Sequence, residues 1–302
     1  MYEEWFGFSR PPFNNTPDTS FYFPSERHNE ALAQLMYTVG QRKGFAVLTG
    51  EIGAGKTTVC RSLLRELEED GAATALVTNP RLNGVQLLYT VAREFGLELP
   101  DERVDRLAIM DAINEFLIEM LSQDRNVVLV IDEAQNLPLA TMEEVRLISN
   151  LETERDKLIQ ILLLGQPELR QKLAHPSLVQ LRQRIVMRYH LEALGEREML
   201  EYIQHRMRVA GSHHAARFSS RAIHIIYRYS HGIPRLINLV CDRAFLVAFT
   251  EETHKITSQV VITAIKEIEG PEWSFKQTAI QEEKARKKKS FLRLPFFADR
   301  TR

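Results

Sequence analysis

Short apolar runs alternate with amphipathic stretches along the first two thirds of the chain. Five runs are apolar on both faces and predict strands at residues 45–49, 73–78, 126–131, 158–164 and 185–191. Apolar positions recur at helical spacing in 26–41, 85–95 and 107–121, which predicts helices there. Strands of this kind that alternate with helices indicate a parallel sheet covered on both sides. The pattern therefore predicts an α/β fold with a five-stranded parallel sheet.

The rhythm changes after residue 192, where the strand-like runs stop. Helical spacing continues and predicts four helices, at residues 196–209, 219–229, 234–250 and 258–269. We therefore expect a second, all-helical unit. Residues 1–25 show no periodicity and are rich in aromatic residues and proline. We expect this segment to be irregular and to pack its rings onto the domain that follows it.

Composition sets limits on the kind of protein. The chain has 302 residues, of which 44% are apolar and 26% charged, as in ordinary soluble globular proteins. Its apolar runs are far shorter than the roughly 18 residues of a spanning helix. The acidic, aromatic start of the chain lacks the features of a signal peptide. We therefore expect a cytoplasmic location.

The charge and the cysteine content bear on whether the protein binds nucleic acid or a structural metal ion. The net charge of −1 does not favour general binding to nucleic acid, although basic residues gather at 182–208 and 284–289. The two cysteines, Cys60 and Cys241, lie in separate predicted helices. No pair of cysteines has metal-ligand spacing, so both are expected to be small buried residues.

A glycine-rich motif follows the first predicted strand. Residues 50–57, GEIGAGKT, match the pattern G-x-x-x-x-G-K-[ST] between an apolar strand and an amphipathic helix. Glycines let backbone N–H groups close around phosphate oxygens, and the start of the helix adds positive potential. Lys56 is expected to bridge the β- and γ-phosphates of ATP, and the Thr57 hydroxyl to ligate Mg²⁺. The residues expected to bind the nucleotide are Gly50, Glu51, Ile52, Gly53, Ala54, Gly55, Lys56, Thr57 and Thr58.

Two adjacent carboxylates follow the third predicted strand. Asp132 and Glu133 emerge at its carboxyl end, where ligands bind in open α/β sheets. Asp132 is expected to hold Mg²⁺ and Glu133 to polarise the water that attacks the γ-phosphate. A solvated turn would explain the pair equally well without the glycine-rich loop. With that loop, the doublet favours ATP hydrolysis.

These residues resemble the AAA+ ATPases, and more narrowly the general secretion pathway protein A (ExeA/GspA) group. The resemblance covers about residues 1–268. It rests on segments at 8–13, 16–22, 26–28 and 50–58, on IDEAQ at 131–135, GQPEL at 165–169, LRQRI at 181–185, and GIPR at 232–235. The fold that it implies is a P-loop domain followed by an all-helical lid.

The resemblance also implies roles for further residues. Gln166 would orient water near the γ-phosphate, and Arg235 would reach the phosphates from the lid. Arg184 would be an arginine finger that acts on the ATP of a neighbouring copy, with Arg182 as the competing candidate. Residues 21–27 would line the adenine pocket. A finger in trans implies a homo-oligomer, expected to be a ring.

The expected organisation has four parts. An aromatic lead-in at 1–25 packs on the ATPase core, the AAA+ domain spans 26–192, the lid spans 193–270, and a basic, poorly ordered tail spans 271–302. Some relatives continue into a membrane span and an outer domain, and this chain is expected not to. Its tail joins a basic block at 284–289 to aromatic residues, which favours peripheral contact with an anionic membrane surface.

Two functions from different classes remain open. The first is an ATPase that drives assembly or positioning of a secretion or pilus-type complex at the inner face of the membrane, with ATP and Mg²⁺ as cofactors. The second is a DNA-associated regulator of the transposition type, which assembles with ATP and recruits a partner. In that case the arginines at 182–208 would meet phosphates, and binding would weaken with salt.

Overall fold

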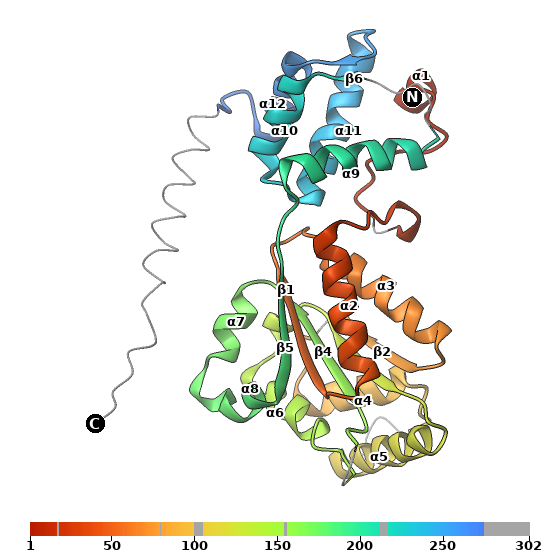
Figure 1. Ribbon diagram of the computed structural model, residues 1–302. Coiled ribbons are helices and arrows are strands. Elements are labelled where there is room, and N and C mark those ends of the chain that lie inside the picture. Colours follow the sequence, from red (N-terminus) through yellow and green to blue (C-terminus); the bar gives the residue numbers. More distant parts are fainter. Residues whose placement is uncertain (17, 79, 100–104, 154–155, 212–216, 275–302) are drawn as a thin grey trace, which may run out of the picture.

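The computed structural model describes residues 1–274 apart from residues 17, 79, 100–104, 154–155 and 212–216. Within this part, a domain built on a sheet lies beside a helical domain (Figure 1). Most of the expected tail at 271–302, including its basic block, lies outside the described residues.

The sheet has five parallel strands in the order β2-β3-β4-β1-β5. The strands are β1 (Phe45–Gly50), β2 (Ala73–Val77), β3 (Val127–Ile131), β4 (Gln160–Gly165) and β5 (Ile185–Leu191). Each predicted strand is present, with ends shifted by up to two residues. Because all five strands are parallel, the carboxyl ends of β1, β3 and β4 share one edge of the sheet, where the predicted phosphate loop begins.

Helices cover both faces of the sheet, as expected. Helices α2 (Glu26–Gly40) and α3 (Lys56–Glu69) pack on one face around Ala46, Leu48 and Val130. The opposite face packs around Val47, Leu129 and Leu163. It is covered by α4 (Gly84–Glu94), α5 (Arg106–Ser122), α6 (Leu139–Ile148), α7 (Glu168–Leu173) and α8 (Val179–Arg184).

Short one-turn elements complete the connections on this second face. They are η2 (Ala134–Asn136) after β3 and η3 (Pro176–Leu178) before α8. Together with the short helices α7 and α8 they escape a periodicity search, because six residues or fewer do not repeat a 3.6-residue pattern twice.

The lid contains α9 (Glu196–Val209), α10 (Ser220–Ser230), α11 (Pro234–Thr250) and α12 (Ser258–Glu269), close to the predicted bounds. One expectation needs correction, because strands do not stop at residue 192. The two-residue strands β6 (Arg217–Phe218) and β7 (Lys255–Ile256) pair in parallel. Two residues are too few to leave an alternating pattern in the sequence. None of the helices in the described ranges is both long and apolar enough to cross a membrane.

The N-terminal segment differs from the expectation that it packs on the ATPase core. It forms α1 (Tyr2–Phe6) and η1 (Thr19–Phe21), and its rings join the core of the lid. Phe6, Phe8 and Phe13 lie 4.7, 5.3 and 5.7 Å, between ring centroids, from Phe245 of α11. Figure 1 shows α1 beside the lid helices. The aromatic content predicted burial, but not which of the two cores receives the rings.

Candidate functional site

The glycine-rich loop joins β1 to α3 and has the backbone shape that its glycines permit. Gly53 and Gly55 have φ values of +80° and +102°, in the region that L-residues rarely adopt. A Cβ atom on Gly55 would lie 2.4 Å from Nε2 of His28, and one on Gly53 would lie 2.5 Å from Cβ of Arg235. The loop is therefore packed between α2 and the lid, and its glycines are required by space as well as by backbone conformation.

Lys56 lies inside the loop at the start of α3. Its ammonium group donates to the carbonyl oxygens of Gly50 and Glu51, both at 2.9 Å, and the residue is 5% exposed. Burial lowers the pKa of Lys56, while the nearby carboxylates of Glu133 and Asp132 act in the opposite direction. The position fits a cation that exchanges loop carbonyls for phosphate oxygens.

Thr57 and Asp132 lie close enough to share one cation. The Thr57 hydroxyl donates to Oδ2 of Asp132 at 3.2 Å, and Asp132 is 7% exposed. Mg²⁺ prefers oxygen ligands and is commonly held by one or two carboxylates together with substrate phosphates. A hydroxyl and a carboxylate beside a phosphate-binding loop fit that ion, and they supply only part of its coordination shell.

Glu133 has a constrained position next to Asp132. Its φ of +52° lies in the left-handed region, which is uncommon for a residue with a side chain, and its N–H donates to Oδ1 of Asp132 at 2.8 Å. Its Oε2 atom accepts from Nε2 of Gln166 at 2.9 Å and also from the side-chain amide of Gln135. The structure therefore brings Glu133 and Gln166 together at the carboxyl ends of β3 and β4.

Gln135 was missed by the sequence reasoning, although it belongs to the IDEAQ segment. Its amide nitrogen donates to Glu133, while its Oε1 accepts the backbone N–H of Gln166 at 3.1 Å. Lys172 fixes the backbone here by donating to the carbonyl oxygens of Gln135 and Leu137. Gln135 thus links the ends of β3 and β4, and its side chain bonds both expected catalytic residues.

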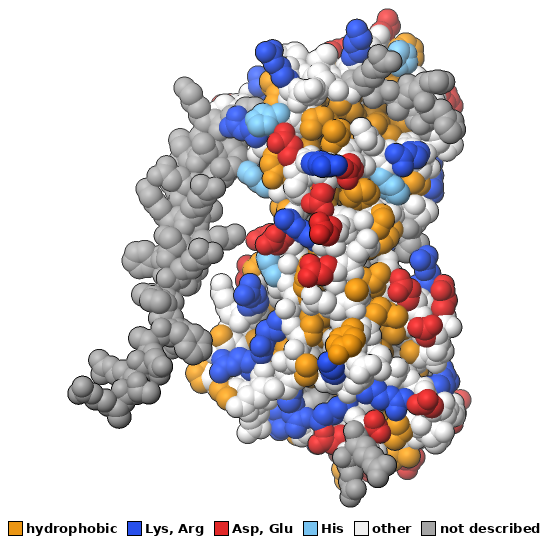
Figure 2. Space-filling model, in the orientation of Figure 1, with side chains coloured by type: hydrophobic (Ala, Val, Ile, Leu, Met, Phe, Trp, Pro, Cys, Tyr) orange, Lys and Arg blue, Asp and Glu red, His pale blue; other side chains and the backbone are white. Residues whose placement is uncertain are grey.

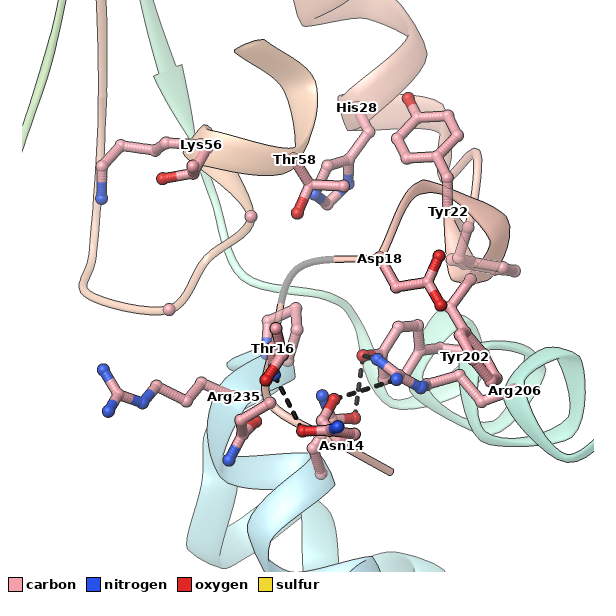
Figure 3. Close-up of a pocket in the computed structure, with 18 of the residues that line it drawn as sticks. Asn14, Thr16, Asp18, Tyr22, His28, Lys56, Thr58, Tyr202, Arg206 and Arg235 are labelled. Atoms are coloured by element: carbon pink, nitrogen blue, oxygen red, sulfur yellow. Dashed lines mark hydrogen bonds between the residues drawn. The ribbon is translucent and has the colours of Figure 1, made fainter. Parts of the chain in front are cut away.

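Arg235 reaches the loop from the lid. Its backbone N–H donates to the carbonyl oxygen of Gly53 at 3.3 Å, and its side chain is exposed. Figure 3 shows the side chains of Arg235 and Lys56 on the same side of the cavity. Pro234 occupies the first turn of α11, where its fixed φ favours the helix start. The sequence GIPR therefore places an arginine at the contact between lid and loop.

Arg184 is not part of the same site. It ends α8 just before Ile185, which pairs with Phe45 at the amino end of the strands. At ~3.3 Å per residue, this edge is about 16 Å from the loop along β1. Arg184 donates to the carbonyl oxygen of Ser149 at 3.1 Å, whereas Arg182 lies within 3.4 Å of the carbonyl oxygen of Ala174. Arg184 thus lies at the edge of the sheet opposite to the loop, and as a finger it would act only on the nucleotide of a neighbouring copy.

A cavity of about 410 Å³ extends from the loop between the two domains. Its size falls in the range of ligand pockets. Lys56 and Thr58 border one end, while Asp18, Tyr22, Tyr202 and Arg206 border the other (Figure 3). Phe21, Tyr22 and Phe23, which belong to the segment 21–27 expected at the adenine pocket, line the cavity. Arg27 does not line it and instead donates to the carbonyl oxygen of Ala193 in the link to the lid.

His28 connects this cavity wall to the phosphate loop. Its Nε2 lies 3.2 Å from the carbonyl oxygen of Ala54, and its Nδ1 lies 2.6 Å from the Ser25 hydroxyl. Because a carbonyl only accepts, Nε2 carries the proton and Nδ1 accepts from Ser25. Burial lowers the pKa of His28, which favours this neutral form. The residue was noted in the sequence only as part of a motif.

Arg206 holds the N-terminal segment against the lid. It is 7% exposed, and it donates to the carbonyl oxygens of Pro12 and Asn14 at 2.6 and 3.0 Å and to the Tyr202 hydroxyl at 2.9 Å. Its guanidinium carbon also lies 4.6 Å from the centroid of the Phe21 ring. Arg206 belongs to the stretch 182–208 whose arginines were expected to meet phosphates in a DNA-associated function, and in the structure it forms part of the cavity wall.

Comparison with known proteins supports the fold and the family. A family model for an AAA domain matches residues 39–173. General secretion pathway protein A of Aeromonas hydrophila is 42% identical over 270 residues, which cover 89% of this chain and 49% of that protein. The chain thus spans about half the length of this relative.

Solved structures with low sequence identity share the fold. The ORC2 protein of Aeropyrum pernix, in ADPNP–ADP complexes, aligns with a TM-score of 0.61 at 16% identity, covering 86% of this chain and 72% of that one. Cdc6p from Pyrobaculum aerophilum gives 0.62 at 21% identity, with 83% and 71% covered. The RuvB branch migration motor of Thermotoga maritima gives 0.51 at 18% identity, with 81% and 69% covered.

The matches to known proteins and the geometry of the site point to the same family. The ORC2 and Cdc6p structures share the fold over 86% and 83% of this chain, which is built on a parallel sheet with the loop at its carboxyl edge. The resemblance to general secretion pathway protein A extends beyond the AAA domain into the lid. This chain is therefore an AAA+ P-loop NTPase related to general secretion pathway protein A.

Proposed function

We propose that this chain binds ATP in the cavity below the lid and hydrolyses it with Glu133. The supporting observation is the position of the Glu133 carboxylate, which is held by Gln166 and Gln135 beside Lys56, Thr57 and Asp132. An acid fixed at this point is suited to accept a proton from the attacking water. Without it, the loop would support binding alone.

The other site residues complete the proposed chemistry. Lys56 and the loop N–H groups bind the phosphates, and Thr57 and Asp132 would hold Mg²⁺, which would neutralise charge that develops on the phosphates. Gln166 orients water together with Glu133. Arg235 brings the lid onto the bound nucleotide. Arg184 acts on the ATP of the neighbouring copy, so the active form is a homo-oligomer and is expected to be a ring.

The proposed biological role is assembly or positioning of a cell-envelope secretion or pilus-type complex. Its support is the relationship to general secretion pathway protein A along most of this chain. The proposal places the protein in the cytoplasm, at the inner face of the cytoplasmic membrane. The alternative, a DNA-associated regulator, draws support from a basic stretch at residues 169–191 that contains no Asp or Glu.

Two variants test the nucleotide chemistry. Lys56→Ala should abolish binding of a fluorescent ATP analogue, whereas Lys266→Ala, which removes an exposed lysine of α12, should bind as the wild type does. Glu133→Gln should bind and fail to turn over. Equal binding by both lysine variants would show that the loop is not the nucleotide site.

Fractionation tests the envelope role separately. Glu133→Gln with ATP should sediment with the envelope fraction of cells that express it, whereas Lys56→Ala should remain in the supernatant. If both variants distribute alike while the nucleotide results hold, the ATPase assignment stands and the envelope role does not.

A further inference from the structure

Residues 169–191 form a basic surface with an unusual composition. The segment contains Arg170, Lys172, Arg182, Arg184 and Arg188 and no Asp or Glu, although the whole chain has a net charge of −1. It runs through α7, η3, α8 and β5. Figure 2 shows blue side chains over the part of the molecule that contains β5 and α8, and red ones gathered near the junction of the domains.

Three of these arginines surround one hollow. Arg170 of α7, Arg182 of α8 and Arg188 of β5 are all exposed, and they line a cavity of about 190 Å³ whose floor includes Val47 and Leu173. The hollow is smaller than the ~300 Å³ from which ligand pockets begin. It is therefore suited to one group of a larger molecule, while the exposed rim leaves room for the rest of that molecule to continue across the surface.

The three arginines make no ion pair within the described part of the chain. Carboxylates pair there with many of the other arginines, namely Arg10, Arg27, Arg42, Arg65, Arg93, Arg106, Arg146, Arg197 and Arg243. At the hollow, by contrast, Arg188 donates to the carbonyl oxygen of Arg182 at 2.8 Å. Three guanidinium groups on one rim without a carboxylate create a positive potential that attracts an external anion.

The planar guanidinium group favours a particular class of anion. Its fork of N–H donors matches phosphate oxygens in pairs, and repeated phosphates along a chain add contacts at each further arginine. Arg182 and Arg184, two residues apart on α8, contact opposite neighbours, Ala174 and Ser149. The hollow and the proposed trans finger therefore use different sides of the same short helix.

The hollow also adjoins the nucleotide site. Thr49 lines it, directly precedes Gly50 of the phosphate loop, and bonds through its hydroxyl to Nδ1 of His190 at 3.0 Å. Helix α7, which carries Arg170, begins two residues after Gln166. A molecule bound at the rim would thus contact β1, which leads into the phosphate loop, and α7, which follows Gln166.

We propose that this hollow is a second anion site, which binds the phosphodiester backbone of nucleic acid through Arg170, Arg182 and Arg188. The site lies on the outer edge of the sheet and is separate from the ATP cavity. It does not depend on ATP hydrolysis, so its test can fail while the proposed ATPase function stands.

Binding of a labelled oligonucleotide to the full chain tests the site. Fluorescence anisotropy is recorded at several salt concentrations for the wild type, for Arg170→Ala/Arg188→Ala, and for Arg221→Ala, which removes one exposed arginine of the lid. We expect the double variant to bind at least about tenfold more weakly. We also expect it to lower the slope of log K against log salt by about 1.4 for single strands, at ~0.7 per phosphate contact.

The controls separate this site from other basic regions. Arg221→Ala should retain the affinity and the slope of the wild type, and fluorescent ATP should bind the double variant as before. An Arg170→Lys/Arg188→Lys variant keeps the positive charges but loses the paired N–H donors of the guanidinium groups. Its affinity for the oligonucleotide should lie between those of the wild type and the double alanine variant.

Three results would overturn the proposal. One is binding that is the same in the double variant and the wild type, which would assign it to the basic block at 284–289 or elsewhere. A second is no binding of single-stranded or duplex oligonucleotide under conditions in which ATP binds. The third is equally tight, arginine-dependent binding of labelled poly-glutamate, which would assign the hollow to an acidic protein partner.

Discussion

Gln135 shows how one amide can define the geometry of the whole site. Its nitrogen donates to the carboxylate of Glu133 and its oxygen accepts from the backbone of Gln166. A Cβ atom on Gly165 would lie 2.7 Å from that same oxygen, so the end of β4 is shaped around this side chain. Gln135 therefore acts as a positioning residue for Glu133, without itself facing the nucleotide cavity.

Gln135→Ala should lower kcat for ATP hydrolysis by roughly tenfold to a hundredfold, because a hydrogen bond to a charged group contributes about 1.5–3 kcal/mol. The KM should stay within about twofold, since the residue does not line the cavity. Steady-state phosphate release measures both constants. Gln259→Ala, at an exposed position of α12, is the control. A tenfold or larger rise in KM with an unchanged kcat would contradict a role of Gln135 in positioning Glu133.

His28 links stability to pH through its buried, neutral ring. Burial lowers its pKa below the ordinary 6.5, so the unfolded chain takes up a proton at a higher pH than the folded chain does. The stability that the neutral ring contributes is therefore present above about pH 6.5 and is lost as the pH falls towards the folded pKa.

His28→Gln should flatten this acid-side loss, since an amide can still donate to the Ala54 carbonyl and does not titrate. Thermal midpoints of both proteins between pH 5 and pH 8 test it. His205→Gln is the comparison, because burial lowers the pKa of His205 in the same direction without contact to the loop. If the dependence of the thermal midpoint on pH persists in His28→Gln and disappears in His205→Gln, the loss of stability comes from His205 and the prediction for His28 is wrong.

At the scale of single residues, sequence alone predicted the parts that a short motif fixes. Lys56, Thr57, Asp132 and Glu133 could be named because a strand end and a glycine loop determine where they point. Gln135 and His28 could not, since their partners, Gln166 and Ala54, are distant in sequence. Only the fold brings such pairs together.

At the scale of elements, the phosphate loop and helix α11 meet at a contact that leaves no space for a side chain. The N–H of Arg235 bonds the carbonyl oxygen of Gly53, whose own Cβ position is filled by Arg235. The lid is thus seated directly on the loop. Movement of the loop when phosphates bind would be transmitted to α11 without an intermediate side chain.

Gly53→Ala should weaken ATP binding by roughly tenfold or more, because left-handed strain of about 1–2 kcal/mol adds to the clash with Arg235. Gly71→Ala is a matched control, since Gly71 also has a φ of +80° but open space around its Cβ position. Equilibrium binding of a fluorescent ATP analogue compares the two. Similar affinities in both variants would mean that the contact between loop and lid does not contribute to binding.

Whether an element could be predicted from the sequence depended on its length. The five strands and the long helices repeat their pattern enough times to be recognised, and their order predicts the parallel sheet. The pair β6 and β7 and the helix α1 are too short for that. Where the N-terminal rings pack depended on Phe245, an aromatic residue that lies far along the chain in α11.

At the scale of the whole molecule, the N-terminal segment ties the lid to the sheet domain. Its rings lie in the lid core, Arg206 binds its backbone at Pro12 and Asn14, and Ser25 and His28 then reach the phosphate loop. Residues of this segment, from Asn14 to His28, thus line the cavity between the two domains. Nucleotide binding should therefore order the lid and this segment together.

The distance between Arg184 and the loop leads to a prediction about assembly. Arg184→Ala should assemble with ATP but remain inactive, and Glu133→Gln should be inactive for a different reason. Mixed at equal amounts, they should recover activity, because about a quarter of the interfaces would then pair an intact Glu133 with an intact finger. Phosphate release of the mixture measures this recovery. A mixture as inactive as its two components would contradict a finger that acts in trans.

Release of phosphate from a single bound ATP measures directly whether Glu133 takes part in hydrolysis. Wild type and Glu133→Gln are loaded with γ-labelled ATP and Mg²⁺ at protein excess, and bound nucleotide and free phosphate are followed over time. We predict equal loading, with release slower by at least about a hundredfold in the variant, because the variant lacks the general base. Release at the same rate from both proteins, with loading confirmed, would contradict hydrolysis by Glu133.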